Sequence, residues 1–349
     1  MTVSIGFIGF GKSTTRYHLP YVLKRKKIRV KTIYSRTRKY QLEQEYQEYG
    51  IQFTDDLDNL LKDDEIQSVV ICTPHETHYD LARICLEHNK HVIVEKPFAP
   101  SVKEARELYR MAHERNLIIT PYQNRRFDGD FLALQEVLEK GYIGKAVELE
   151  SHIDYDRPGI PLPKDHVNRA FYGLGVHTTD QMVSIFGAPE KVYYDIRSQS
   201  EGSNDYYHVE LFYKNFKAIV KTSMLVKTPY PRFILHGTKG SFIKYGIDKQ
   251  EECLKAGRMP WEKDFGIDPK ENYGKVSFTD EEGKDRNLRI PTPLGDYGRF
   301  YDVFVEAVEG KKGSLVTEEE ALAVIEILEN GFSGQNPRVH AFNKNNKTE

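Results

Sequence analysis

The chain has 349 residues, which predicts two domains, and its 39% apolar and 12% aromatic residues are typical of globular cores. A net charge of −2 argues against nucleic acid as a partner, and no apolar run reaches the roughly 18 residues of a membrane helix. Three widely spaced cysteines form neither a disulfide framework nor a metal-ligand pattern. We therefore expect a cytoplasmic protein that binds no nucleic acid, no membrane and no metal ion.

The first third of the chain alternates short apolar stretches with helical patterns. The expected strands are 3–8, 29–34, 68–72, 91–95 and 117–120. The expected helices are a segment from the first glycines to about residue 23, then 39–49, 79–88 and 102–115, the last capped by Ser101. The run SVVIC at 68–72 is typical of a parallel strand covered on both faces. This alternation predicts an α/β Rossmann dinucleotide-binding domain, which we assign to residues 1–122.

The pattern changes after residue 122. One helix is expected at 131–139, and period-2 patterns then predict strands at 146–155, 191–199, 207–215, 217–226 and 232–237. A final helix, 317–330, begins at Thr317 and has three glutamates in its first turn, which suits the helix dipole. Residues 123–349 are therefore predicted to form an α+β domain with a large open-faced sheet, mixed or antiparallel.

The opening stretch GFIGFGKST fits two phosphate-binding patterns. Read from Gly6 it is G-x-x-x-x-G-K-S, a P-loop, which would indicate a phosphotransferase or nucleotide hydrolase. Read from Gly9 it begins the dinucleotide fingerprint G-x-G-x-x-G, with Thr14 in the third glycine position. Only five residues precede Gly6, too few for the strand that a P-loop needs, so we prefer the second interpretation. It predicts cofactor contacts from Gly9, Gly11, Lys12, Ser13 and Thr14, although a solvated Lys12 is the alternative.

The end of the second strand indicates which dinucleotide binds. NAD sites use an acidic residue about 20 residues past the glycines to bind the ribose hydroxyls, but no Asp or Glu occurs between Gly6 and Gln41. Ser35 and Arg36 stand there instead, and a guanidinium pairs well with a phosphate. We expect NADP, with NAD still possible; the alternative is a solvated basic loop.

An ordered set of later motifs resembles the Gfo/Idh/MocA oxidoreductase family. The motifs are Thr73-Pro74-His75-Glu76-Thr77-His78, Glu95-Lys96-Pro97 and Gly175-x-His177-x-x-Asp180. The branch they resemble contains scyllo-inositol dehydrogenases and uncharacterised bacterial sugar oxidoreductases. The resemblance implies a Rossmann domain followed by an open-faced sheet domain, and an NAD(P)-dependent dehydrogenase acting on CH–OH groups.

The resemblance also implies roles for individual residues. Lys96 would hold the alcohol oxygen, and His177 would act as general base, with Asp180 orienting the imidazole or the substrate. Related inositol dehydrogenases carry an aspartate four residues before the histidine, where this chain has Gly173, so no role of that carboxylate is carried over. Further cofactor contacts are expected from Thr73, Pro74, His78, Glu95, Lys96, Asn124 and Arg126, and substrate contacts from Tyr155, Arg157 and Asp180.

These inferences give one leading function and one alternative. The first is an NADP-dependent oxidoreductase that moves hydride between nicotinamide and a secondary alcohol or ketone of a sugar or cyclic polyol. The second is a catalytically weak NADP(H)-binding sensor that keeps the Rossmann site.

His75 and His78 lie at i and i+3, not at the i and i+4 of a zinc motif, so no metal is expected. The second-domain sheet is expected to join a homodimer or homotetramer.

Overall fold

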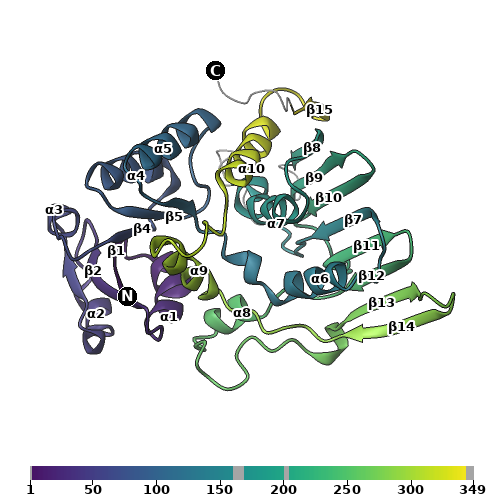
Figure 1. Cartoon of the computed structure of the whole chain (residues 1–349), viewed down its shortest axis with the longest axis horizontal. Helices are drawn as coiled ribbons and strands as arrows, with labels where there is room; N and C mark the ends of the chain where they lie inside the picture. The colour runs from purple at the N-terminus through teal and green to yellow at the C-terminus, as the bar shows by residue number, and fades with distance from the viewer. Residues whose placement is uncertain (1, 160–168, 200–203, 343–349) are drawn as a thin grey trace. The chain divides into compact units, whose positions relative to one another are not determined.

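The computed structural model describes residues 2–159, 169–199 and 204–342, and the chain divides into two compact units (Figure 1). The first unit comprises residues 1–124, 252–265 and 296–325. The second comprises residues 125–251, 266–295 and 326–349. Each unit has its own sheet.

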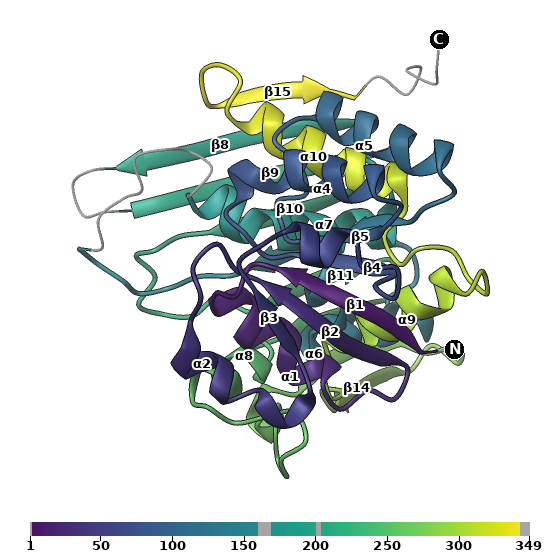
Figure 2. The same cartoon turned by 90° about the vertical axis from the view of Figure 1, so that its left-hand side faces the viewer.

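The sheet of the first unit has six parallel strands in the order β3-β2-β1-β4-β5-β6. Their bounds are β1 Val3–Ile8, β2 Ile28–Tyr34, β3 Gln52–Thr54, β4 Ser68–Ile71, β5 His91–Val94 and β6 Ile119–Pro121. Figure 2 shows β1, β2 and β3 lying side by side. The chain crosses from one side of β1 to the other after β3, so the point of reversal lies between β1 and β4.

Helices cover both faces of this sheet, as expected for buried parallel strands. They are η1 Thr14–His18, α1 Leu19–Val22, α2 Tyr40–Gln44, η2 Gln47–Tyr49, α3 Asp58–Leu61, η3 His75–Thr77, α4 His78–Glu87, α5 Val102–Glu114 and α9 Arg299–Val308. One core cluster joins β4 and β5 to α4, α5 and the first part of α10 (Glu318–Gly331). On another side of the sheet His18 packs against Phe7, and Tyr122 packs against Phe300 of α9.

The second unit contains a mixed sheet of nine strands in the order β14-β13-β12-β11-β7-β10-β9-β8-β15, in which only β7 and β10 pair in parallel among the described strands. The bounds are β7 Ala146–His152, β8 Lys191–Gln199, β9 Asn204–Tyr213, β10 Phe216–Thr222, β11 Phe233–Gly237, β12 Gly240–Lys244, β13 Gly274–Thr279, β14 Asp285–Ile290 and β15 Arg338–Ala341. Its helical segments include α6 Gly129–Glu139, η6 Phe171–Gly175, α7 Val176–Phe186 and η7 Lys270–Asn272, while η4 Asn124–Phe127 and α8 Gln250–Lys255 lie at unit boundaries.

The two faces of this second sheet differ in burial. Tyr194 and Tyr207 are fully buried and both lie against the Phe171 ring of η6. Because side chains alternate along a strand, their neighbours Tyr193 and His208 lie on the opposite face. That face carries a hollow of about 380 Å³ lined by Tyr193, Asp195, His208, Glu210, Phe212 and Val339. The sheet is therefore covered by helices on one side and open on the other within its own unit.

The structure confirms most predicted elements and corrects several bounds. The 3–8 strand and the Ser101 cap are confirmed, since the Ser101 hydroxyl accepts a hydrogen bond from the Glu104 amide. The single helix predicted at 39–49 is wrong, because the short helices α2 and η2, separated by a turn at residues 45–46, stand in its place. The strand predicted at 146–155 ends at His152, and the one at 217–226 ends at Thr222.

Candidate active site

The glycine turn after β1 has the geometry that a dinucleotide site requires. Gly9 has φ +106°, and a Cβ there would lie 2.8 Å from the carbonyl oxygen of Cys72, so only glycine fits. A Cβ added to Gly11 would meet nothing within 4 Å, which leaves open space at the position where a pyrophosphate would approach. Gly6 lies inside β1, where its α-carbon faces Leu60. The strand thus ends at Ile8, as the dinucleotide interpretation requires and the P-loop interpretation does not.

Of the three side chains that follow the turn, Lys12 faces solvent, whereas Ser13 and Thr14 form hydrogen bonds within the unit. Lys12 is exposed. Thr14 is buried, and its hydroxyl donates to the Gly9 carbonyl at 2.7 Å, so the threonine in the third glycine position closes the turn. The Ser13 hydroxyl donates to a carboxylate oxygen of Glu95, which follows β5.

The loop after β2 carries three basic side chains, which differ in their contacts with the described residues. Arg38 forms two hydrogen bonds with the buried Glu43 carboxylate, and Lys39 donates to the Phe10 carbonyl at 2.5 Å. Pairing with Arg38 lowers the pKa of Glu43. Arg36 is exposed, and no hydrogen bond or ion pair joins it to another residue in the described part of the chain. Ser35 donates its hydroxyl to the Thr37 carbonyl.

A cavity of about 220 Å³ lies at the carboxyl ends of β1, β4 and β5. Its lining residues are Ser13, Tyr17, Cys72, Thr73, Glu95 and Lys96. The ends of parallel strands beside the point of reversal are the usual ligand site of an open α/β sheet. The cavity therefore joins the predicted phosphate turn to the predicted catalytic lysine within one unit. The Lys96–Pro97 peptide is cis.

Three donors surround the Glu95 carboxylate in this cavity. It accepts from the Ser13 hydroxyl, from the Lys96 amide at 3.1 Å and from Nε2 of His18 at 3.0 Å. Burial alone would raise the pKa of Glu95, but the hydrogen bond and the charge of His18, the positive charge of Lys96 and the Ser13 hydrogen bond lower it to about 2. Glu95 is therefore ionised throughout the physiological pH range.

Sequence reasoning missed the aromatic residues behind Glu95. His18 is fully buried, its Nδ1 lies 2.5 Å from the Tyr301 hydroxyl, and its ring stacks on Tyr122 at 4.1 Å. Burial raises the pKa of Tyr301 and of Tyr122 well above the ordinary value, so both keep their protons. Tyr301 could have been found from the spacing of Phe300, Tyr301 and Phe304, which is typical of an amphipathic helix.

His78 connects the ends of β4 and β5. Its ring nitrogens lie 2.8 Å and 2.9 Å from the carbonyl oxygens of Pro97 and Thr73, and burial lowers its pKa. The imidazole therefore lies between two loops that bear predicted cofactor residues, Thr73-Pro74 and Lys96, and in its neutral form it donates to one of the two carbonyls. The described residues contain no group of three or more His, Cys, Asp or Glu side chains able to hold a metal ion.

In the second unit, α7 carries His177 and Asp180. His177 is buried near the start of the helix, one turn before Asp180. Both carboxylate oxygens of Asp180 accept hydrogen bonds from the Arg126 guanidinium, at 2.7 Å and 2.8 Å. Arg126 and Asp180, predicted to bind cofactor and substrate respectively, thus form a buried bidentate ion pair. A Cβ added to Gly173, in the preceding turn, would meet nothing within 4 Å, so the position has space for a side chain.

A second buried ion pair, Arg232–Asp130, is connected to α7 through Gln181. Arg232 donates to Asp130 at 2.8 Å, to the Ser151 hydroxyl at 2.6 Å and to the side-chain oxygen of Gln181 at 2.7 Å. The Gln181 side chain in turn donates to the Arg125 carbonyl. Arg232 therefore links β11 to α6, β7 and α7 and fixes the helix that presents His177.

The remaining predicted residues lie near the end of β7 or at the junction of the units. The Arg157 guanidinium lies 4.0 Å from the centre of the Tyr155 ring, a cation–π contact, and the backbone amides of both residues bond to the chain segment 223–224. Asn124 is buried at the start of η4. The structure thus places Tyr155 and Arg157 together.

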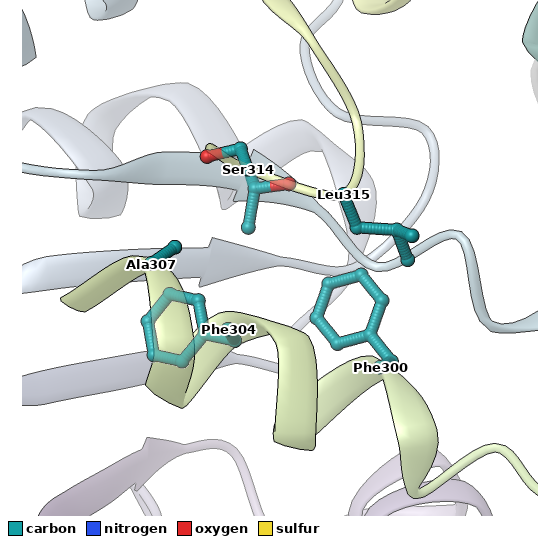
Figure 3. Close-up of a pocket in the computed structure, with 6 residues that line it drawn as sticks. Phe300, Phe304, Ala307, Ser314 and Leu315 are labelled. Carbon is teal, nitrogen blue, oxygen red and sulfur yellow. The ribbon is translucent and has the colours of Figure 1, made fainter. Parts of the chain in front are cut away.

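A separate hollow in the first unit does not resemble a polar-ligand site. Figure 3 shows Phe300, Phe304 and Ala307 of α9 facing Ser314 and Leu315. Thr120 completes the lining, which contains no charged side chain.

Among the described helices, none is both long and apolar enough to span a bilayer.

Comparison with known proteins agrees with the geometry of both units. The chain matches the oxidoreductase family with an NAD-binding Rossmann fold over residues 3–123, and that family's C-terminal α/β domain over residues 135–339. YhhX, an uncharacterised oxidoreductase of Escherichia coli (strain K12), is 48% identical over 97% of this chain and 98% of YhhX. IolW of Bacillus subtilis (strain 168), a scyllo-inositol 2-dehydrogenase (NADP(+)), is 30% identical over 94% of this chain and 92% of IolW.

A solved structure supports the same assignment. The crystal structure of an oxidoreductase from Bacillus cereus superimposes with a TM-score of 0.96 at 50% identity, and the match covers 98% of this chain and 99% of that one. The chain therefore belongs to the Gfo/Idh/MocA oxidoreductase family, and its first unit is the family's NAD-binding Rossmann domain.

Proposed function

We propose that the protein is an NADP-dependent oxidoreductase that transfers hydride between nicotinamide and a secondary alcohol or ketone of a sugar or cyclic polyol. The observation that carries this proposal is the cavity at the ends of β1, β4 and β5, where the glycine turn, Glu95 and Lys96 meet. The open space above Gly11 fits a bound pyrophosphate, and the Gly9 turn supports it. When bound, the nicotinamide would supply or accept the hydride.

Arg36 supports NADP over NAD. The neighbouring Arg38 and Lys39 form hydrogen bonds with the Glu43 carboxylate and the Phe10 carbonyl, respectively. Arg36, in contrast, is exposed at the end of β2, where a 2′-phosphate would lie. IolW, the NADP(+)-dependent relative, agrees with this preference.

Replacing Arg36 with aspartate is expected to weaken NADPH binding by about tenfold or more and to favour NADH relatively, because a charge-assisted phosphate contact is lost. Fluorescence titration with both cofactors measures the change. Arg29→Asp, at the opposite end of the same strand, is the matched control and should leave both affinities unchanged. Equal NADPH and NADH affinities in the unaltered protein would contradict the NADP assignment.

The chemical roles follow from residue types. As an ammonium, Lys96 would hold the substrate oxygen and stabilise the negative charge that develops when an alcohol loses its proton. His177 would accept that proton as general base. The family aspartate is absent at Gly173, so His177 or a water molecule carries the proton transfer.

A polyhydroxylated substrate suits the polar side chains assigned to the site. The side chains of Lys96, His177, Tyr155 and Arg157 can all form hydrogen bonds with a ligand. A substrate without hydroxyls would leave these donors and acceptors without a partner on the ligand. The relative named as a scyllo-inositol dehydrogenase supports a cyclic polyol.

A paired screen tests the substrate class. NADPH oxidation and NADP+ reduction are followed with inositols, aldoses and their keto derivatives, and with aliphatic alcohols and ketones of equal size. We expect turnover only with the hydroxyl-rich set. A preference for the aliphatic set would overturn the polyol assignment. Cofactor binding without turnover on any of them would favour the alternative, an NADP(H)-binding sensor, which Gly173 motivates.

We also propose that the open face of the nine-stranded sheet joins copies of the chain in a homodimer or homotetramer. The hollow that exposes Tyr193, His208 and Phe212 on this face supports the proposal. Light scattering of the purified protein measures the oligomeric state, and a monomer would exclude it.

A further inference from the structure

The strand order indicates which part of the cofactor faces the Glu95 cavity. A dinucleotide spans the point of reversal, with one nucleotide over each half of the sheet. Arg36, proposed to bind the 2′-phosphate, follows β2 on one side of the glycine turn, whereas Glu95 and Lys96 follow β5 on the other. The nicotinamide half therefore belongs over β4 and β5, an assignment that rests on the proposed function.

The cavity over these strands contains two opposite charges. Lys96 and Glu95 are neighbours in the chain, and both line the cavity. The oxidised nicotinamide ring carries a positive charge, and the reduced ring is neutral. A lysine alone would repel the oxidised ring and so lower the affinity of the cavity for the oxidised cofactor relative to the reduced one.

The structure fixes the Glu95 carboxylate by three donors from separate parts of the unit. Ser13 comes from the glycine turn, His18 from the end of η1 and the Lys96 amide from the end of β5. Behind His18, the Tyr301 hydroxyl lies 2.5 Å from Nδ1 and holds the ring so that Nε2 is directed at Glu95. This directed set of donors holds a negative charge in a water-poor place, where screening is weak.

We propose that Glu95, oriented by His18 and Tyr301, determines the redox preference of cofactor binding: its carboxylate offsets the charge of Lys96 and allows the cavity to accept the oxidised, positively charged nicotinamide. Glu95 is thus a specificity-determining residue for the cofactor's oxidation state. Its low pKa keeps this effect constant across the physiological pH range.

The test is the ratio of two dissociation constants, that of NADP+ divided by that of NADPH, measured by titration without substrate. Glu95→Gln removes the charge and keeps the shape, and we expect the ratio to rise about tenfold. Glu95→Asp keeps the charge and should leave the ratio within about threefold of that of the unaltered protein. Glu76→Gln, the same substitution at an exposed site beside the end of β4, is the control and should leave it unchanged.

Several outcomes would overturn the proposal. An unmoved ratio in Glu95→Gln, or an equal rise in Glu95→Asp, would exclude the charge as the cause. Should Glu95→Gln not fold, the unaltered protein decides: the two affinities should lie within about tenfold of each other, and a hundredfold preference for NADPH would contradict the offset. Binding of neither cofactor to the unaltered protein would instead contradict the proposed function itself.

Discussion

Replacing Lys96 with alanine, or His177 with alanine, is expected to lower kcat by about 10²–10⁴-fold with the correct substrate, because each variant removes a group that we propose stabilises negative charge or accepts the proton at the reacting hydroxyl. Steady-state kinetics measures this, and circular dichroism checks that the fold is retained. Lys96 lines the cavity at the end of β5, and His177 is held on α7, whose Gln181 is bonded to Arg232.

Lys103→Ala serves as the matched control, because this lysine is exposed on α5. Its turnover should equal that of the unaltered protein. Near-native turnover in either the Lys96 or the His177 variant would remove that residue from the mechanism.

Replacing Asp130 with alanine is expected to destabilise the protein by about 3–5 kcal/mol, because it leaves the Arg232 guanidinium buried without its counter-charge. Urea unfolding, followed by the fluorescence of the second unit's aromatic residues, measures the loss. Asp58→Ala breaks an exposed ion pair with Lys62 one helical turn away and should cost far less. Equal losses in the two variants would show that burial of the Arg232–Asp130 pair has no special effect.

The sequence predicted those parts of the fold in which local chemistry and tertiary packing agree. The Gly9 turn was predictable because its positive φ demands glycine, and the start of α10 because Thr317 and Glu320 bond to each other's backbone amides. The strand β14 escaped prediction because five of its six residues are exposed, which leaves no alternation of apolar residues to detect. It exists because β13 pairs with it along its length.

For the site, the sequence indicated which residue types are present but not which of them pair. Arg126 and Asp180 are 54 positions apart, and their bidentate contact depends on the packing of η4 against α7. The contact of His18 with Tyr301 spans 283 positions, and a lone histidine in a helix gives no sign of a partner at that distance. Glu95 was assigned to the cofactor from its motif, whereas its three donors follow only from the fold.

The first unit draws on residues 1–124, 252–265 and 296–325, so this unit can close only after a ribosome has translated the chain through residue 325. Until then His18 lacks the Tyr301 hydroxyl, and the core face that Val316, Ala321 and Ile325 cover stays open to water. A nascent chain that stalls before residue 296 would expose this apolar surface to chaperones and proteases. Competence to hold a cofactor thus waits for residues 296–325, although the glycine turn is translated long before them.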